Sequence, residues 1–308
     1  MLSGIFGLLG GIGMPMQTSV NARLGRKMGS PFIAAFINFL VGTAALLILT
    51  MIVERGLHIP FSEIAKNPPW LLFGGAFAVV FVTGNILLIP RIGSVQTAIL
   101  PALGQIIMGT LIDSFGWFQQ EVRPLSLLRI VGVALVIFGV VTIILAKNAN
   151  QSRVKSNQVK GVWLWRLLGI VAGMCMASQT AVNSHLGAVV GSRFYAALIN
   201  FCVGLSILFI LYLILGRGKK PKVKDQNSPW WIWIGGLFGV LFVVGNIITA
   251  QALGTGMAVI ILLTGLMIGG LLVDQFGLFE SKQRPVSWKE ILGVLVMVCG
   301  AALFHLMH

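Results

Sequence analysis

Charge is scarce in this chain, and acidic charge is the scarcest. Charged residues make up 10% of the 308 positions, against about 25% in soluble domains, and only 8 of them are Asp or Glu. The three cysteines, Cys175, Cys202 and Cys299, are odd in number and lie in apolar runs, and no metal-ligand spacing is present. The composition excludes an ordinary soluble domain and a disulfide scaffold, and we expect no metal and no cofactor.

Apolar residues fill the space that charge leaves. Hydrophobic residues make up 57% of the chain, and the mean hydropathy is +0.95. A bilayer core about 30 Å thick needs roughly 20 apolar residues per helix. We therefore predict an all-α membrane protein with ten transmembrane helices. Their approximate ranges are 2–20, 32–53, 70–90, 94–113, 126–146, 163–183, 194–215, 230–251, 253–273 and 288–306.

The basic residues lie in short clusters between these runs. The 22 Lys and Arg therefore indicate a membrane protein rather than a partner of nucleic acid. The expected partners are the lipid bilayer and a small-molecule substrate, and a homodimer is left open.

The chain contains the same unit twice. Residues 17–42 and 179–204 are identical at 16 of 26 positions without a gap, at an offset of 162. At an offset of 161 the match continues to the end of the unit. We predict a first five-helix repeat over 1–146, a cytoplasmic linker over 147–162 and a second repeat over 163–308.

An odd number of helices per repeat would place the second copy upside down relative to the first. Lys and Arg concentrate in cytoplasmic loops, and the odd-numbered connections hold 17 of the 22 basic residues. The basic cluster after the first helix is replaced in the second copy by His185, Ala188 and Val189. We therefore predict inverted repeats in the cell membrane (plasma or inner membrane), with both termini outside.

Inverted repeats are typical of secondary transporters that work by alternating access. We predict such a transporter, exporting a small polar or amphipathic metabolite or drug. A membrane-embedded enzyme that acts on lipid is an alternative, although the sequence shows no nucleophile with its base and no carboxylate pair for a metal. A receptor or assembly protein that does not transport is a further alternative.

Seven amide side chains inside the apolar runs are candidates for lining a substrate site. Six of them match between the copies. The seventh, Gln105, has Leu266 at the matching position of the second copy. Hydrogen bonds between membrane helices are worth only about 0.6–2 kcal/mol, so polar contact between helices is the alternative interpretation. The seven candidates are Gln17, Asn38, Asn85, Gln105, Gln179, Asn200 and Asn246.

One acidic residue ends the fourth helix of each copy. Asp113 and Asp274 are each followed ten residues later by an Arg-Pro pair, Arg123 and Arg284 being the cations. We expect an ion pair that closes each loop, with a proton relay as the alternative. No Asp or Glu lies in the middle of an apolar run, which disfavours exchange of a cationic drug for protons.

These motifs in combination resemble the drug/metabolite transporter superfamily and, within it, the YdcZ-type branch. They are Gln-x3-Asn followed by Leu-Gly and Gly-Ser, Ile-Asn-Phe, Gly-Asn, Asp-x-Phe-Gly and Arg-Pro, and each occurs in both halves. The chain looks like two such five-helix units fused in tandem. The resemblance implies a ten-helix bundle in the cell membrane and a role in export, and it implies no particular substrate.

Overall fold

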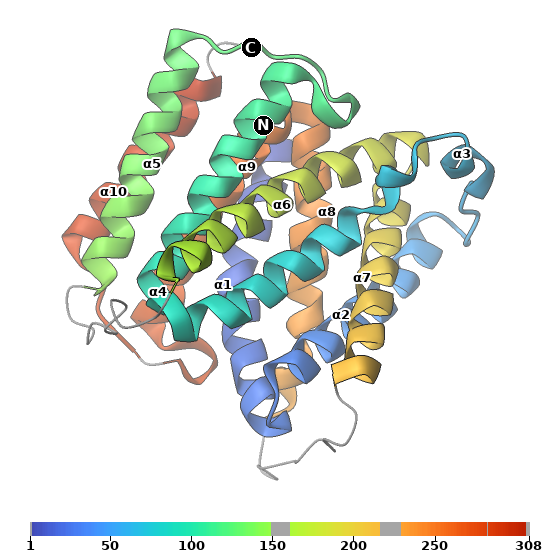
Figure 1. Ribbon diagram of the computed structural model, residues 1–308, viewed down its shortest axis with the longest axis horizontal. Coiled ribbons are helices and arrows are strands. Elements are labelled where there is room, and N and C mark those ends of the chain that lie inside the picture. Colours follow the sequence, from blue (N-terminus) through green and yellow to red (C-terminus); the bar gives the residue numbers. More distant parts are fainter. Residues whose placement is uncertain (1, 149–160, 216–228, 282, 306–308) are drawn as a thin grey trace.

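The computed structural model describes residues 2–148, 161–215, 229–281 and 283–305, and these residues form a helical bundle (Figure 1). Most of the predicted linker, residues 149–160, lies outside this description. The secondary structure assigned to the described residues consists of helices and turns. The long helices are α1 (Leu2–Met28), α2 (Pro31–Val53), α4 (Gly74–Phe115), α5 (Leu127–Asn148), α6 (Val162–Val189), α7 (Arg193–Leu215), α8 (Gly235–Leu253), α9 (Thr255–Phe276) and α10 (Trp288–His305).

Short helical elements precede or follow several of the long helices, and the sequence did not predict them. In the first half one 3-10 turn precedes α4 and another follows it. In the second half one precedes α8 and another follows α9. These elements are α3 (Phe61–Ala65), η1 (Pro69–Leu72), η2 (Trp117–Gln119), η4 (Trp230–Trp233) and η5 (Leu278–Glu280).

Among the described helices, seven segments are long and apolar enough to cross a membrane. One prediction differs from the structure here, because the ranges 70–90 and 94–113 are not separate helices. They form the single helix α4, which changes direction near its middle (Figure 1). Only its second part, Gln96–Phe115, is among the seven, and its first part appears as the shorter apolar helix Gly74–Asn85. The matching residues of the second half form two helices, α8 and α9, separated at Gly254.

Large apolar side chains cover much of the outer surface, as expected for helices surrounded by lipid. On α2, Ile48 and Ile52 are 61% and 71% exposed, and Phe138 on α5 is 64% exposed. Such extensive apolar exposure is rare on a soluble monomer. The chain is therefore a multi-pass membrane protein.

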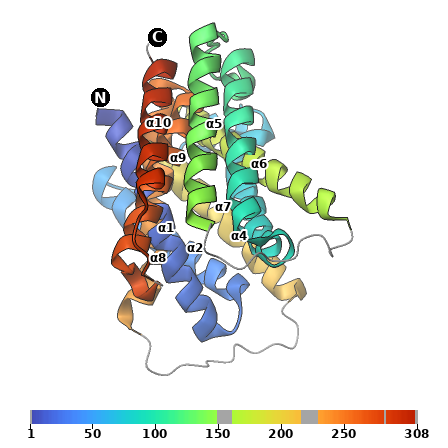
Figure 2. The same cartoon turned by 90° about the vertical axis from the view of Figure 1, so that its left-hand side faces the viewer.

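The two halves pack against each other through matching helices. Helix α6 of the second half packs along α4, and its counterpart α1 packs along α8 and α9. The two fifth helices, α5 and α10, lie side by side (Figure 2), and the two second helices, α2 and α7, pair as well. Rings of Phe39 and Phe201 meet with centroids 5.2 Å apart in the α2–α7 contact.

Glycines at equivalent positions allow these helices to approach closely. A Cβ atom on Gly11 would overlap the carbonyl oxygen of Leu262 in α9, and one on Gly173 would overlap the carbonyl oxygen of Pro101 in α4. Gly11 matches Gly173, and Leu262 matches Pro101. The same backbone contact is therefore made twice, once in each direction between the halves.

Candidate functional site

The predicted amide residues of the first two helices form one cluster in each half. In the first half Gln17 Nε2 donates to Asn38 Oδ1 at 3.1 Å. In the second half both Gln179 and Asn183 donate to Asn200 Oδ1, at 3.5 and 3.1 Å. The structure therefore brings together Gln17 with Asn38, and Gln179 with Asn200.

Each amide cluster faces the start of the third helix of the other half. A Cβ on Gly235, the first residue of α8, would lie 2.5 Å from Asn21 Oδ1 and 2.9 Å from Asn38 Oδ1. A Cβ on Gly74, the first residue of α4, would likewise crowd the equivalent second-half cluster. The matching pairs Gly74-Gly75 and Gly235-Gly236 thus begin helices that dock on amide side chains.

The two clusters differ in exposure. In the second half Gln179, Asn183 and Asn200 are 2–3% exposed, whereas Gln17 and Asn21 in the first half are only partly buried. Three buried atoms of the second cluster, Gln179 Oε1, Asn183 Oδ1 and Asn200 Nδ2, have no hydrogen-bond partner among the described residues.

The candidate residues of the third helices also behave differently in the two halves. Asn246 of α8 is buried and donates to Thr180 Oγ1 of α6 at 2.7 Å. The matching residues, Asn85 and Thr18, make no such bond: Thr18 is exposed and donates to the carbonyl of Met14 in its own helix. The side-chain oxygens of both Asn85 and Asn246 have no partner among the described residues, so the two halves differ in the bond to the threonine.

Gln105 lies in the second part of α4 and is 4% exposed. Its side-chain oxygen has no hydrogen-bond partner within the described part of the chain. A buried amide oxygen without a partner carries a desolvation cost of about 1–3 kcal/mol, so a donor from a ligand or water would stabilise it. Because Leu266 stands at the matching position, this feature belongs to the first half alone.

We refer to two ends of the bundle by the acidic residue at each. The Asp113 end contains the end of α4 and the junction of α8 with α9, and the Asp274 end contains the end of α9 and the end of α1. In Figure 1 the loop after α4 is at the top and the loop after α9 is at the bottom. The two ends are therefore opposite.

At the Asp113 end, a carboxylate of the first half binds the start of a helix of the second half. Asp113 Oδ1 and Oδ2 accept the backbone N–H groups of Thr255 and Gly256, each at 2.9 Å. The Arg123 guanidinium donates to the carbonyl of Leu253, the last residue of α8. Within its own loop, the Asp113 carbonyl accepts the N–H of Arg123 at 2.7 Å, and the charge of Arg123 also acts on the Asp113 carboxylate.

At the Asp274 end, the expected ion pair is present. Arg284 lies 3.4 Å from Asp274 Oδ2, and it also donates to Glu290 at the start of α10. Burial lowers the pKa of Arg284, but its hydrogen bond and attraction to Glu290, with the charge of Asp274, outweigh that effect and raise the pKa. Arg284 therefore stays charged and held between two carboxylates.

Helices α4 and α9 also approach closely at the Asp113 end. A Cβ on Gly109 of α4 would lie 3.3 Å from both Gly256 and Val259 of α9. In addition, Gln251 of α8 donates to the carbonyl of Ser184 of α6 at 3.0 Å.

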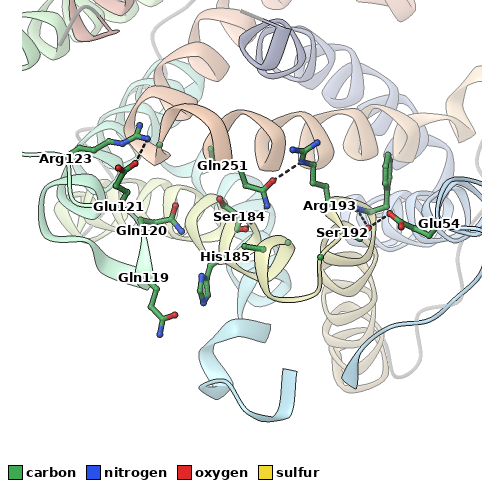
Figure 3. A pocket seen from close by; sticks show the side chains of 16 residues that line it. Glu54, Gln119, Gln120, Glu121, Arg123, Ser184, His185, Ser192, Arg193 and Gln251 are labelled. Atoms are coloured by element: carbon green, nitrogen blue, oxygen red, sulfur yellow. Dashed lines mark hydrogen bonds and ion pairs between the residues drawn. The ribbon is translucent and has the colours of Figure 1, made fainter. Parts of the chain in front are cut away.

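A polar cavity of about 670 Å³ lies at the Asp113 end (Figure 3). Its wall includes residues that the sequence did not single out, and Figure 3 shows them converging from α6, the start of α7, the end of α8 and the loop after α4. Most of its charged groups have polar partners: Arg123 lies 3.0 Å from Glu121, and Arg193 donates to Gln251 at 2.9 Å. Further lining residues include Glu54, Gln120, Ser184, His185 and Ser192.

A second cavity, of about 520 Å³, lies at the Asp274 end. It is lined by Asn21, Ala22, Gly25, Arg26, Gly29 and Pro31. Five of these six positions match residues of the larger cavity, Ser184, Gly187, Ala188, Gly191 and Arg193. The duplication could have indicated this pair of cavities, but Gln251, whose counterpart is Pro90, gave no signal.

The helical membrane bundle and its duplicated polar residues define a membrane protein of the transporter class. The model of the family described as "Putative inner membrane exporter, YdcZ" matches residues 2–142 and again residues 164–303. The chain therefore belongs to this exporter family and contains its unit twice.

One relative agrees with this assignment, and one solved structure shares the fold. The chain is 29% identical over 135 residues to the inner membrane protein YdcZ of Escherichia coli (strain K12), which covers 43% of this chain and 88% of that protein. A crystal structure of another protein matches with a TM-score of 0.72, over 99% of this chain and 96% of the other, at 15% identity. The second match concerns the fold alone.

Proposed function

We propose that this protein is a secondary transporter of the drug/metabolite type, with ten membrane spans arranged as two inverted five-helix repeats. It works by alternating access and exports a small polar or amphipathic metabolite or drug. In this arrangement both termini lie outside the cell, so that the Asp113 end faces outward and the Asp274 end faces the cytoplasm.

The reciprocal contacts between the halves support the inverted arrangement. The contact of Gly11 with Leu262 is repeated by Gly173 with Pro101, and the matching cavities lie at opposite ends of the bundle. A pseudo-twofold axis in the membrane plane relates equivalent elements in this way. The predicted linker would then start and end on the cytoplasmic side.

The observation that carries the proposal is the difference between the two ends. At the Asp113 end, Asn246 bonds to Thr180, Gln251 bonds to Ser184, and Asp113 binds the start of α9. The matching Asn85 and Thr18 remain apart at the other end. A protein that closes one end while the other is open must form a contact at one end and lack the equivalent contact at the other. The two halves, although similar in sequence, differ in this way.

The seven amide residues are proposed to line the path. Asn85 and Gln105 are the strongest candidates for substrate contact because, among the described residues, neither side chain is hydrogen-bonded to another and both have an oxygen without a partner. Gln17, Asn38, Gln179, Asn200 and Asn246 already bond to other side chains and would position the helices around the substrate. Uncharged amides suit a neutral or zwitterionic solute better than a bulky cation.

The test has two stages. Metabolites inside and outside cells are first compared with and without the protein, and the solutes that differ are then measured for flux in proteoliposomes under defined ion gradients. We expect a protein-dependent flux that saturates with solute concentration, and protein-free liposomes are the control. An absence of solute movement across a broad metabolite set would contradict the proposal.

A further inference from the structure

The junction between α8 and α9 depends on a residue of the other half. Gly254 separates the two helices with φ +85° and ψ 166°, a backbone conformation that is essentially restricted to glycine. Its missing side chain provides no cap for α9. Asp113 fills that role from α4, because its two oxygens accept the N–H groups of Thr255 and Gly256.

Both free helix ends at this junction are satisfied by the same loop of the first half. The start of a helix leaves N–H groups without partners and the end leaves carbonyl groups without partners. Asp113 accepts from the start of α9, while Arg123 donates to Leu253 at the end of α8. A carboxylate is also favoured at a helix start by the helix dipole.

The Asp274 end has the same residue types in a different arrangement. Gly93 matches Gly254, yet the first half has the single helix α4 from Gly74 to Phe115 where the second half has two. No second helix start is formed there for Asp274 to cap, and Asp274 pairs with Arg284. The halves are thus alike in sequence at this motif and different in structure.

The two ends also differ at a buried charged position. Glu290, buried at the start of α10, accepts a hydrogen bond from Arg284, and its counterpart in the first half is Arg129. Arg129 is buried too, and it donates to the carbonyl of Arg123. Glu290 therefore holds Arg284 near α10, whereas a second cation leaves Arg123 directed at α8.

We propose that Asp113 and Asp274 are positioning residues that cap alternate helix junctions and so determine which end of the bundle is closed. In the opposite state, α4 breaks at Gly93, Asp274 accepts the N–H groups of Ser94 and Val95, and Arg284 leaves Glu290. Asp113 releases α9, and α8 and α9 join. The inference rests on the proposed alternating access, because only a protein that exchanges its ends would use both carboxylates.

Matched cysteines can report which end is open. Ala22 is exposed and lines the smaller cavity, whereas its counterpart Ser184 is 3% exposed and lines the larger one. Ala22→Cys and Ser184→Cys are made separately in a background in which Cys175, Cys202 and Cys299 are replaced by serine. The rate of reaction with a water-soluble maleimide is measured for the full-length protein in proteoliposomes opened to reagent on both sides.

Asp113→Asn is the principal variant, because an amide of the same size offers one acceptor oxygen instead of two. We expect the ratio of the Ser184→Cys rate to the Ala22→Cys rate to rise about twofold to 30-fold, the range for losing a helix cap. Gly254→Ala should act in the same direction, since a Cβ there is strained and meets Asp113 and Arg123. Gly93→Ala is the matched control and should lower the ratio, because alanine favours the unbroken helix.

Three outcomes would overturn the inference. One is an unchanged ratio for Asp113→Asn and Gly254→Ala in protein that melts as the parent does. Another is a parallel rise of both rates, which indicates local unfolding instead of exchange between ends. The third is a rise of the ratio for Gly93→Ala.

The labelling needs no substrate, so it separates this inference from the proposed function. A shift of the ratio in a protein without solute flux would support the caps and contradict transport. Saturable flux with no shift of the ratio would support transport and contradict the caps.

Discussion

Replacing Asn246 and Asn85 by leucine tests the path most directly, because the two residues match in sequence and differ in their contacts. Asn246 donates to Thr180 at 2.7 Å between α8 and α6, so Asn246→Leu removes a hydrogen bond that helps to close the Asp113 end. Such a bond in a membrane is worth about 0.6–2 kcal/mol, which corresponds to a shift of roughly threefold to 30-fold toward opening of that end. Asn85 has no comparable bond, and Asn85→Leu should leave the distribution between ends nearly unchanged.

Both variants are expected to abolish transport while they insert normally into the membrane, for different reasons. Asn85→Leu removes a polar contact to the solute, and Asn246→Leu removes a polar contact and also weakens the closed end. Flux in proteoliposomes is measured beside the reactivity of Ser184→Cys, which should rise only with Asn246→Leu. Unchanged flux in either variant would show that the residue serves packing alone and would refute the assigned path.

Two further predictions concern packing and orientation. Gly11→Ala should lower the stability by about 1–3 kcal/mol, because the added Cβ overlaps the Leu262 carbonyl; a melting curve in detergent measures this. Gly4→Ala in the same helix is the control, since its Cβ would meet its nearest neighbour at an ordinary 3.6 Å, and equal melting temperatures would refute the close contact. For orientation, cysteines placed at Lys27 and at Lys220, which is outside the described residues, should react from the cytoplasmic side alone; labelling on opposite sides would refute the inverted arrangement.

The sequence predicted the duplication and most of the helices because both depend on local signals. Apolar runs of about 20 residues fixed the helices, and the gapless match fixed the repeat. The pairing of Gln17 with Asn38 is less local, but their repetition as Gln179 and Asn200 marked all four as related.

Contacts between the halves could not be predicted, because one sequence repeat does not reveal which part of the other repeat it meets. The spacing of Asp113 and Arg123 indicated a contact within their loop, but it gave no sign that the carboxylate also binds the start of α9. Nor did the sequence indicate that α8 and α9 separate at Gly254 while α4 is a single helix. Gly254 and the matching Gly93 both permit a break, and which of them breaks depends on contacts made by distant residues.

The two capped junctions would be built from the same groups, two backbone N–H donors and one carboxylate, so that exchange between them replaces each bond with another of its kind. Alternation requires that the two states differ by only a few kcal/mol, since a larger gap would leave one state unpopulated. The unmatched residues then decide the resting state. Glu290 favours the state described here because Arg284 must leave it before Asp274 can cap α4. Replacing that carboxylate by an amide with Glu290→Gln should therefore favour the opposite state. The ratio of the maleimide labelling rates of Ser184→Cys and Ala22→Cys should then rise. A ratio that stays at the parent value would show that another residue sets the preference for the state described here.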